Sequence, residues 1–176
     1  MKPFKLLLVL SFAFYSTTLL AQVPIDLTTG KARYEEVVTV AGANKDELFK
    51  RLDHWFNSYY KNPTSVIESK DATVGSIKGK YRIDLFTTVP NQPKAKKGLE
   101  YYTIEVNVKD GRYKYTVSDI FFYNTPKIYI ETWVSDKASA NEKDWASQAH
   151  KGITETLENL KKTLSEPVGQ KAEENW

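Results

Sequence analysis

The chain has 176 residues, with 25 Lys and Arg, 22 Asp and Glu, and no cysteine. This length suits one ordinary domain that can bury a core without covalent links, and the absence of cysteine excludes disulfides and thiolate chemistry. A formal net charge of +3 is too small to indicate a nucleic-acid or anionic-membrane partner.

Residues 1–21 are predicted to form a secretory signal peptide. Lys2 and Lys5 give it a positive start, an apolar run follows from Leu6 to Leu20, and Ala21-Gln22 offers a cleavage point. The run is shorter than the roughly 20 residues that a membrane span needs, and an uncleaved anchor is the alternative interpretation. Cleavage would remove two lysines and lower the formal charge from +3 to +1. We therefore expect an exported protein, periplasmic or secreted, with no stable membrane span.

The rest of the chain divides into three expected parts. Residues 22–32, with Pro24 and Gly30, are expected to be a loose leader, residues 33–166 a single α+β domain, and residues 167–176 a flexible tail.

A strand and a helix are predicted first. Arg33 to Val40 is rich in β-branched residues and favours a strand. Asn44 can cap a helix, Glu47 stands at capping-box spacing, and Asn62-Pro63 ends the helical pattern. We expect a helix near residues 44–61, with an apolar stripe made of Leu48, Leu52, Trp55, Phe56 and Tyr59.

Two hairpins follow this helix. The first is predicted from residues 64–69 and 74–86, and residues 87–98 are expected to form an exposed connection. The second spans residues 100–123 around Asp110-Gly111, which favours a type I′ turn and places Lys109 opposite Arg112.

Residues 127–134 (KIYIETWV) are predicted to be the last strand, and residues 142–164 are predicted to form a long amphipathic helix. Ala149 and Gly152 leave room for close approach of that helix to a sheet. The element order predicts an α+β fold, with a single curved antiparallel sheet of about five or six strands. One N-terminal helix and one long C-terminal helix would pack on one face of this sheet.

The stretches RYEEVVTV, ELFKRLDHWF and above all VKDGRYKYTVSDI resemble a known family. It is the uncharacterised bacterial domain-of-unknown-function family 4468, described as having a fold like the TATA-binding protein. The resemblance covers residues 34–122 and rests mainly on residues 108–115. The element order fits a TBP-like or helix-grip-like architecture, and the resemblance implies a TBP-like fold but no activity, cofactor or site residue.

Catalytic chemistry has little basis in this sequence. His54 and His150 lie on separate predicted helices without a second ligand at metal spacing, and no phosphate loop, dinucleotide fingerprint or serine elbow occurs. We expect no enzyme activity, no catalytic or metal-binding residue, and no cofactor.

Asp119 is a polar residue on the core phase of the central hairpin, where the predicted register places it opposite Tyr102. A buried carboxylate would need a donor such as the tyrosine hydroxyl. The alternative is a bulge near Asp119-Ile120 that turns Asp119 outward, and the apolar residues Ile120 and Phe122 favour it.

Two function classes remain open. The first is an exported, non-catalytic binding module that presents its sheet or loops to a partner, either an envelope or extracellular protein or a polymer, but not a nucleic acid. The second is a carrier of a small apolar ligand, held between the sheet and the C-terminal helix. Candidate ligand-binding residues for such a pocket are Tyr81, Tyr102, Tyr115, Asp119 and Trp145, although a packed core would use the same aromatic residues.

Overall fold

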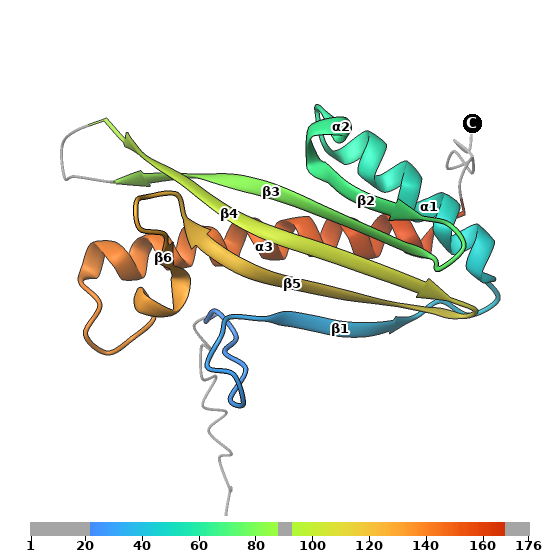
Figure 1. Ribbon diagram of the computed structural model, residues 1–176, viewed down its shortest axis with the longest axis horizontal. Coiled ribbons are helices and arrows are strands. Elements are labelled where there is room, and N and C mark those ends of the chain that lie inside the picture. Colours follow the sequence, from blue (N-terminus) through green and yellow to red (C-terminus); the bar gives the residue numbers. More distant parts are fainter. Residues whose placement is uncertain (1–21, 88–92, 168–176) are drawn as a thin grey trace, which may run out of the picture.

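The computed structural model describes residues 22–87 and 93–167. These residues form one curved antiparallel sheet in the order β1-β5-β4-β3-β2, and β6 pairs with β5 on the edge that β1 also uses (Figure 1). The strands are β1 (Tyr34–Thr39), β2 (Ile67–Asp71), β3 (Ser76–Thr87), β4 (Ala95–Lys109), β5 (Arg112–Phe122) and β6 (Ile128–Tyr129). The predicted fold class is confirmed.

The helices α1 (Lys45–Tyr59) and α3 (Ala140–Ser165) lie on one face of the sheet, behind the strands in Figure 1. Both helices begin as capped helices should. The Asn44 side chain accepts a hydrogen bond from the Glu47 N–H, while Ser139 and Glu142 form a reciprocal capping box. The predicted first helix is therefore confirmed, and α3 begins two residues earlier than predicted because Ser139 is its cap.

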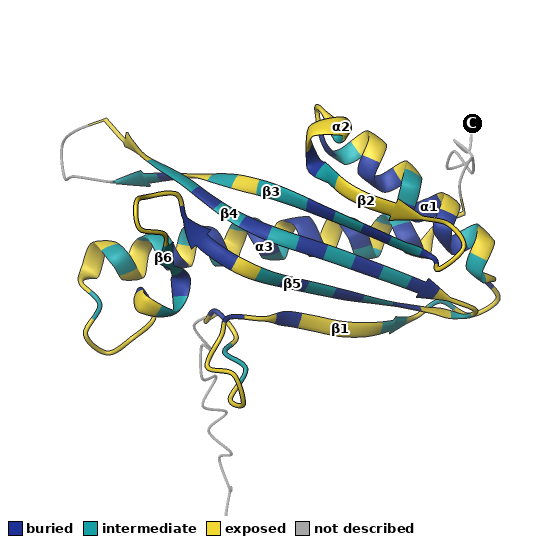
Figure 2. Ribbon diagram, in the orientation of Figure 1, coloured by how far each residue is buried: buried dark blue, intermediate teal, exposed yellow. Residues whose placement is uncertain are grey.

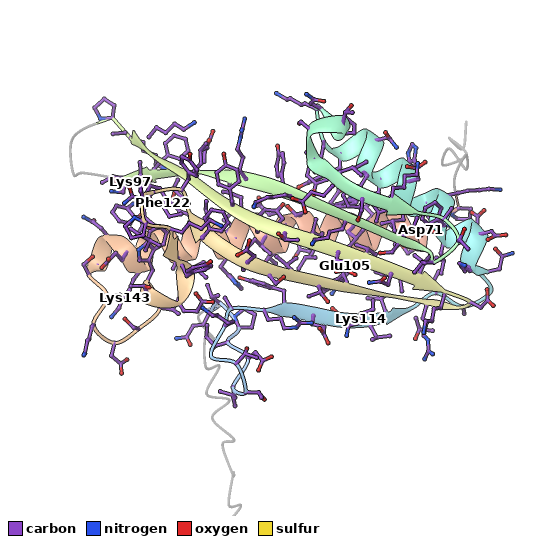
Figure 3. The ribbon with its side chains drawn as sticks, viewed as in Figure 1. Asp71, Lys97, Glu105, Lys114, Phe122 and Lys143 are labelled. Atoms are coloured by element: carbon purple, nitrogen blue, oxygen red, sulfur yellow. The ribbon has the colours of Figure 1, made fainter. Side chains whose placement is uncertain are left out.

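The core lies between the sheet and the helices α1 and α3. Buried residues alternate with more exposed ones along much of β4, as the colours of Figure 2 show. Gly152 of α3 makes this contact close, because a Cβ atom there would lie 2.9 Å from Cδ1 of Ile83. The prediction that Gly152 leaves room for the sheet agrees with this geometry. The open face of the sheet, opposite the helices, carries mostly polar side chains such as Glu105 and Lys114, both labelled in Figure 3.

The central hairpin has the predicted register from Lys109 opposite Arg112 to Thr103 opposite Ser118. The predicted type I′ turn is wrong, because Gly111 has φ of +70° while Asp110 is not among the residues with positive φ. This pattern fits a type II turn, which needs positive φ only at its third position. The physical reason is tertiary, because Asp110 Oδ1 accepts a 2.7 Å hydrogen bond from the Lys45 N–H at the start of α1.

The register shifts between Tyr101 and Thr103, where Asp119 and Ile120 together oppose Tyr102. Asp119 has φ of +51° and is exposed, so the outward interpretation of Asp119 is confirmed and the buried one is wrong. Beyond this bulge the alternation is inverted. Phe121 consequently faces the open side, opposite Tyr101, and Phe122 faces the core.

The predicted last strand over residues 127–134 is mostly wrong. Only Ile128 and Tyr129 pair with β5, and a 3-10 turn, η1 (Ile130–Thr132), follows them. Ile130 and Trp133 are both buried at a spacing of three residues. A 3-10 turn brings side chains at that spacing to one side, which a strand would not do.

The segments that flank the other strands also differ from the predictions. Residues 64–66, predicted to begin a strand, belong instead to the short helix α2 (Pro63–Val66), which has proline in its first turn. β4 already begins at Ala95, so part of the predicted exposed connection is strand.

Residues 22–32 are not a loose leader. Val23 and Ala32 are buried, Ile25 forms a bridge with Ala32, and Asp26 Oδ1 accepts hydrogen bonds from the backbone of the turn between them. The apolar side chains of this leader turn join the domain core, which explains why the segment is ordered. The predicted signal peptide at residues 1–21 lies outside the described residues. Residues 168–176 of the predicted tail also lie outside them.

Candidate interaction surface

A row of four aromatic side chains crosses the open face at the end of the sheet where β4 begins and β5 ends. We call it the aromatic row, and it consists of Tyr123, Tyr101, Phe121 and Tyr129. Neighbouring ring centroids are 5.8 Å, 5.7 Å and 6.0 Å apart along this order. The bulge at Asp119 creates the row, because it turns Phe121 away from the core and toward Tyr101.

Phe121 is the centre of the row and has an unusual environment. Its exposed fraction is only 2%, yet it is absent from the core cluster that contains its neighbour Phe122. Its ring lies nearly parallel to that of Tyr101, with an interplanar angle of 12°. Tyr123, by contrast, is 69% exposed and projects from the end of the row.

Lysine ammonium groups cover the rings of the row. Lys127 Nζ and Lys80 Nζ lie 4.0 Å and 5.1 Å from the Phe121 ring centroid, and Lys31 Nζ lies 4.6 Å from that of Tyr129. Cations over ring faces are attracted by the ring quadrupole. Arg82 stands opposite Tyr101 in the pairing of β3 with β4 and adds a fourth positive charge near the row.

A hollow of about 340 Å³ adjoins the row at the bulge, between the leader turn and β6. It shares Lys31 and Tyr129 with the surface just described and is also lined by Asp26, Thr29, Ala32, Arg33, Ser118, Asp119 and Glu131. Three of these residues are acidic, so this side of the row differs in charge from the side that carries Lys80 and Lys127.

Glu100 lies on the opposite face of the same end of the sheet. Its side chain is fully buried, and neither carboxylate oxygen has a hydrogen-bond partner. Burial, with a smaller contribution from the Glu131 carboxylate, raises the pKa of Glu100 to about 8. Glu131 Oε1 accepts a 2.7 Å hydrogen bond from the Ala32 N–H, and its Oε2 is buried without a partner. Glu100 is therefore mostly protonated at neutral pH.

Of the five pocket residues predicted from the sequence, Tyr81 and Tyr102 are cross-strand neighbours whose ring centroids lie 6.3 Å apart, but the five do not form one group. Tyr102 is fully buried, and its hydroxyl lies 3.3 Å from Thr156 Oγ1 of α3. Tyr115 donates a 2.6 Å hydrogen bond to Glu36 Oε2, at the β1 edge.

The other three predicted residues lie in separate places. Tyr81 borders a hollow of about 460 Å³ with Arg82, Asp84, Lys96 and Leu99, whereas Asp119 borders the hollow at the bulge. Trp145 packs on Trp133, and Lys97 Nζ lies over the Trp145 ring. Lys97 also lies beside Phe122, and both residues are labelled in Figure 3.

The two histidines have structural surroundings. His150 Nδ1 lies 2.9 Å from the Tyr34 hydroxyl and the two rings stack, while burial lowers the pKa of His150. His54 is exposed on α1. Within residues 22–87 and 93–167, no three Asp, Glu, His or Cys side chains are grouped so that they could hold a metal ion.

The sequence analysis did not find the aromatic row or Glu100. The row depends on a bulge and on β6, and neither can be placed by alternation alone. Glu100 had a usable signal, because it continues the buried phase of Tyr102 and Ile104 along β4.

The six-stranded antiparallel sheet with both helices on one face defines an α+β protein of the TBP-like class. The chain belongs to the family described as "Domain of unknown function (DUF4468) with TBP-like fold", whose model matches residues 34–123. The family description names no activity. None of the curated proteins matches this chain.

Two solved structures share this fold. A TBP-like protein from Parabacteroides distasonis has 16% identity and a TM-score of 0.66, covering 82% of this chain and 98% of its own. A DUF4468 family protein from Bacteroides ovatus has 18% identity and a TM-score of 0.65, covering 86% of this chain and 94% of its own. At these identities the likeness concerns the fold alone. In the part of the chain that the structure describes, no helix has the length and apolar character needed to cross a bilayer.

Proposed function

We propose that this protein is an exported, non-catalytic binding module that presents the open face of its sheet to a partner. Phe121 is the observation that carries the proposal. A phenylalanine that is 2% exposed but lies outside the core cluster contributes to a second aromatic cluster, on the face away from the helices. Aromatic residues are enriched where proteins bind partners, so a cluster of them on an otherwise polar face supports a binding role for that face.

Of the two histidines, which a catalytic site would most often use, His150 is engaged in packing and His54 is exposed on α1. His150 is stacked on Tyr34 and within hydrogen-bond distance of its hydroxyl. The aromatic residues expected to line an apolar carrier pocket are likewise part of the core or its edges, and Tyr102 is fully buried. These contacts favour a binding role for the open face over both a chemical role and a carrier role.

Site-specific photo-crosslinking in the host tests the proposed binding face. The photoreactive residue p-benzoylphenylalanine replaces Tyr123, which is 69% exposed at the end of the aromatic row. A matched variant carries it at Lys151 of α3, whose side chain is 78% exposed on the helix side. We expect an adduct of higher mass from position 123 and none from position 151. Adducts from position 151 alone, or from neither position, would contradict the proposal.

Export is a separate part of the proposal and has its own test. Protein recovered from the host envelope or medium should have an N-terminus at or near Gln22. Intact Met1 in the membrane fraction would contradict export by cleavage and would indicate an anchored protein.

A further inference from the structure

We infer that the partner of the aromatic row is an acidic, extended segment of another protein. The inference rests on the proposed function and adds the chemistry of the partner.

The cations around the row are available to a partner. Lys31, Lys80 and Lys127 lie over the rings, and Arg82 stands opposite Tyr101. None of these four takes part in the ion pairs formed within the described residues, although other lysines on the same face do, as Lys114 does with Glu35. Cations without a carboxylate partner beside aromatic rings complement an acidic ligand.

The spacing of the rings fits an extended peptide. Neighbouring centroids are 5.7–6.0 Å apart, and side chains on one side of an extended chain recur about every 6.6 Å, twice the rise per residue. A segment that alternates acidic and apolar residues can therefore place anions against the lysines and apolar groups against the tyrosines. Aromatic anchors that bury apolar side chains supply much of the energy in protein interfaces.

The coverage of the ring faces argues against a single-stranded nucleic acid. Bases stack on open aromatic faces, but Phe121 is 2% exposed, lies nearly parallel to Tyr101 and has Lys127 Nζ 4.0 Å from its centroid. Tyr123 is the most exposed ring of the row. At the adjoining hollow three acidic residues, Asp26, Asp119 and Glu131, outnumber the two basic ones, Lys31 and Arg33, so this hollow does not favour an anion. An acidic segment is therefore confined to the side of the row that carries Lys80 and Lys127.

Fluorescence anisotropy with defined probes tests the inference. The probe is a labelled ten-residue peptide of alternating Glu and Leu, and the comparison probes are alternating Lys and Leu, an oligothymidylate and polygalacturonate. We expect the acidic peptide to bind, and the double variant Lys80→Gln/Lys127→Gln to weaken its binding about tenfold or more. The matched double variant Lys143→Gln/Lys151→Gln, on α3, should bind like the unaltered protein. Binding should also weaken as salt is raised.

Several results would overturn the inference. They are an acidic peptide that fails to bind, binding that survives the Lys80→Gln/Lys127→Gln change, and tighter binding of the basic peptide, the oligothymidylate or polygalacturonate. Each leaves the crosslink from position 123 as an independent result. An adduct there combined with a failed peptide assay would keep the binding face and reject an acidic protein as its partner.

Discussion

On the helix side of the sheet, Tyr102 is fully buried and its hydroxyl lies 3.3 Å from Thr156 of α3. On the open side, the preceding residue Tyr101 stacks on Phe121 without any helix to cover it. Both residues belong to β4, and a difference of one position decides whether an aromatic ring stabilises the core or forms part of a surface cluster. The helix side should therefore respond to mutation through stability and the open side through binding.

The largest expected effect concerns Glu100 on the helix side. Its pKa is raised to about 8 from an ordinary value of 4.5, so the folded protein holds a proton that the unfolded chain releases between these two pH values. The free energy of unfolding should then fall as pH rises through this window, by about 1.4 kcal/mol per pH unit at most. Above pH 8 this loss is complete, and below pH 4.5 it is absent.

Denaturant unfolding at several pH values measures this effect, and Glu100→Gln should remove it. Plotted against pH, the free energies of unfolding of the unaltered protein and of Glu100→Gln should coincide near pH 4.5 and separate as pH rises. The variant should become the more stable of the two. His150 contributes the opposite slope, because its lowered pKa makes the folded state lose stability as pH falls below about 6.5. Because His150 is present in both proteins, its contribution cancels when one free energy of unfolding is subtracted from the other. Glu105→Gln, on the open side of β4, is the matched control, and parallel curves for Glu100→Gln would refute the buried proton.

A second test adds volume where α3 meets the sheet. Gly152→Val should destabilise the protein by about 1–3 kcal/mol, because a Cβ atom there would lie 2.9 Å from Ile83 Cδ1. Thermal unfolding measures the change. Lys151→Val, on the exposed side of the same helix, should cost only about 0.5 kcal/mol through helix propensity. Equal losses in the two variants would mean that α3 does not approach β3 this closely.

Gly111, at the tip of the central hairpin, is a position where a substitution should act on stability through the local backbone and not through packing. Gly111 has φ of +70° and no atom within 4 Å of an added Cβ, so any cost of substitution comes from the backbone. We expect Gly111→Val to lower the free energy of unfolding by about 1–2 kcal/mol. Gly111→Asn should lose less, because asparagine tolerates positive φ. If valine left the unfolding midpoint unchanged, the positive φ at this position would be refuted.

Much of the fold could be predicted because local and tertiary preferences agree. The hairpin register follows from alternation on both sides of Asp110-Gly111, and the start of α1 follows from the cap at Asn44. The turn type was wrong because Asp110 hydrogen-bonds to Lys45, 65 positions away in the sequence, and no local pattern contains that bond. The 3-10 turn was not predicted because apolar and polar residues alternate in part of residues 127–134, and alternation of this kind is typical of a strand.

The candidate site was less predictable than the fold. Phe121 reaches the open face only because a bulge inverts the alternation after Ser118, and Tyr129 joins it through a strand of two residues. The lysines over the rings come from β3, the leader turn and the segment before β6. Sequence spacing does not indicate that such distant residues meet. The aromatic residues named for an apolar carrier pocket pack in the core or against it, which is the alternative that the sequence already favoured.

The most direct test of the contrast between the two faces measures two properties in two variants. Tyr123→Ser removes the exposed end of the aromatic row, and Tyr102→Phe removes a buried hydroxyl on the helix side. We expect Tyr123→Ser to leave the free energy of unfolding within about 0.5 kcal/mol while weakening binding of the acidic peptide. Tyr102→Phe should lower the free energy of unfolding by about 1 kcal/mol and leave binding unchanged. The reverse assignment, with binding sensitive to Tyr102 and stability to Tyr123, would contradict a functional open face.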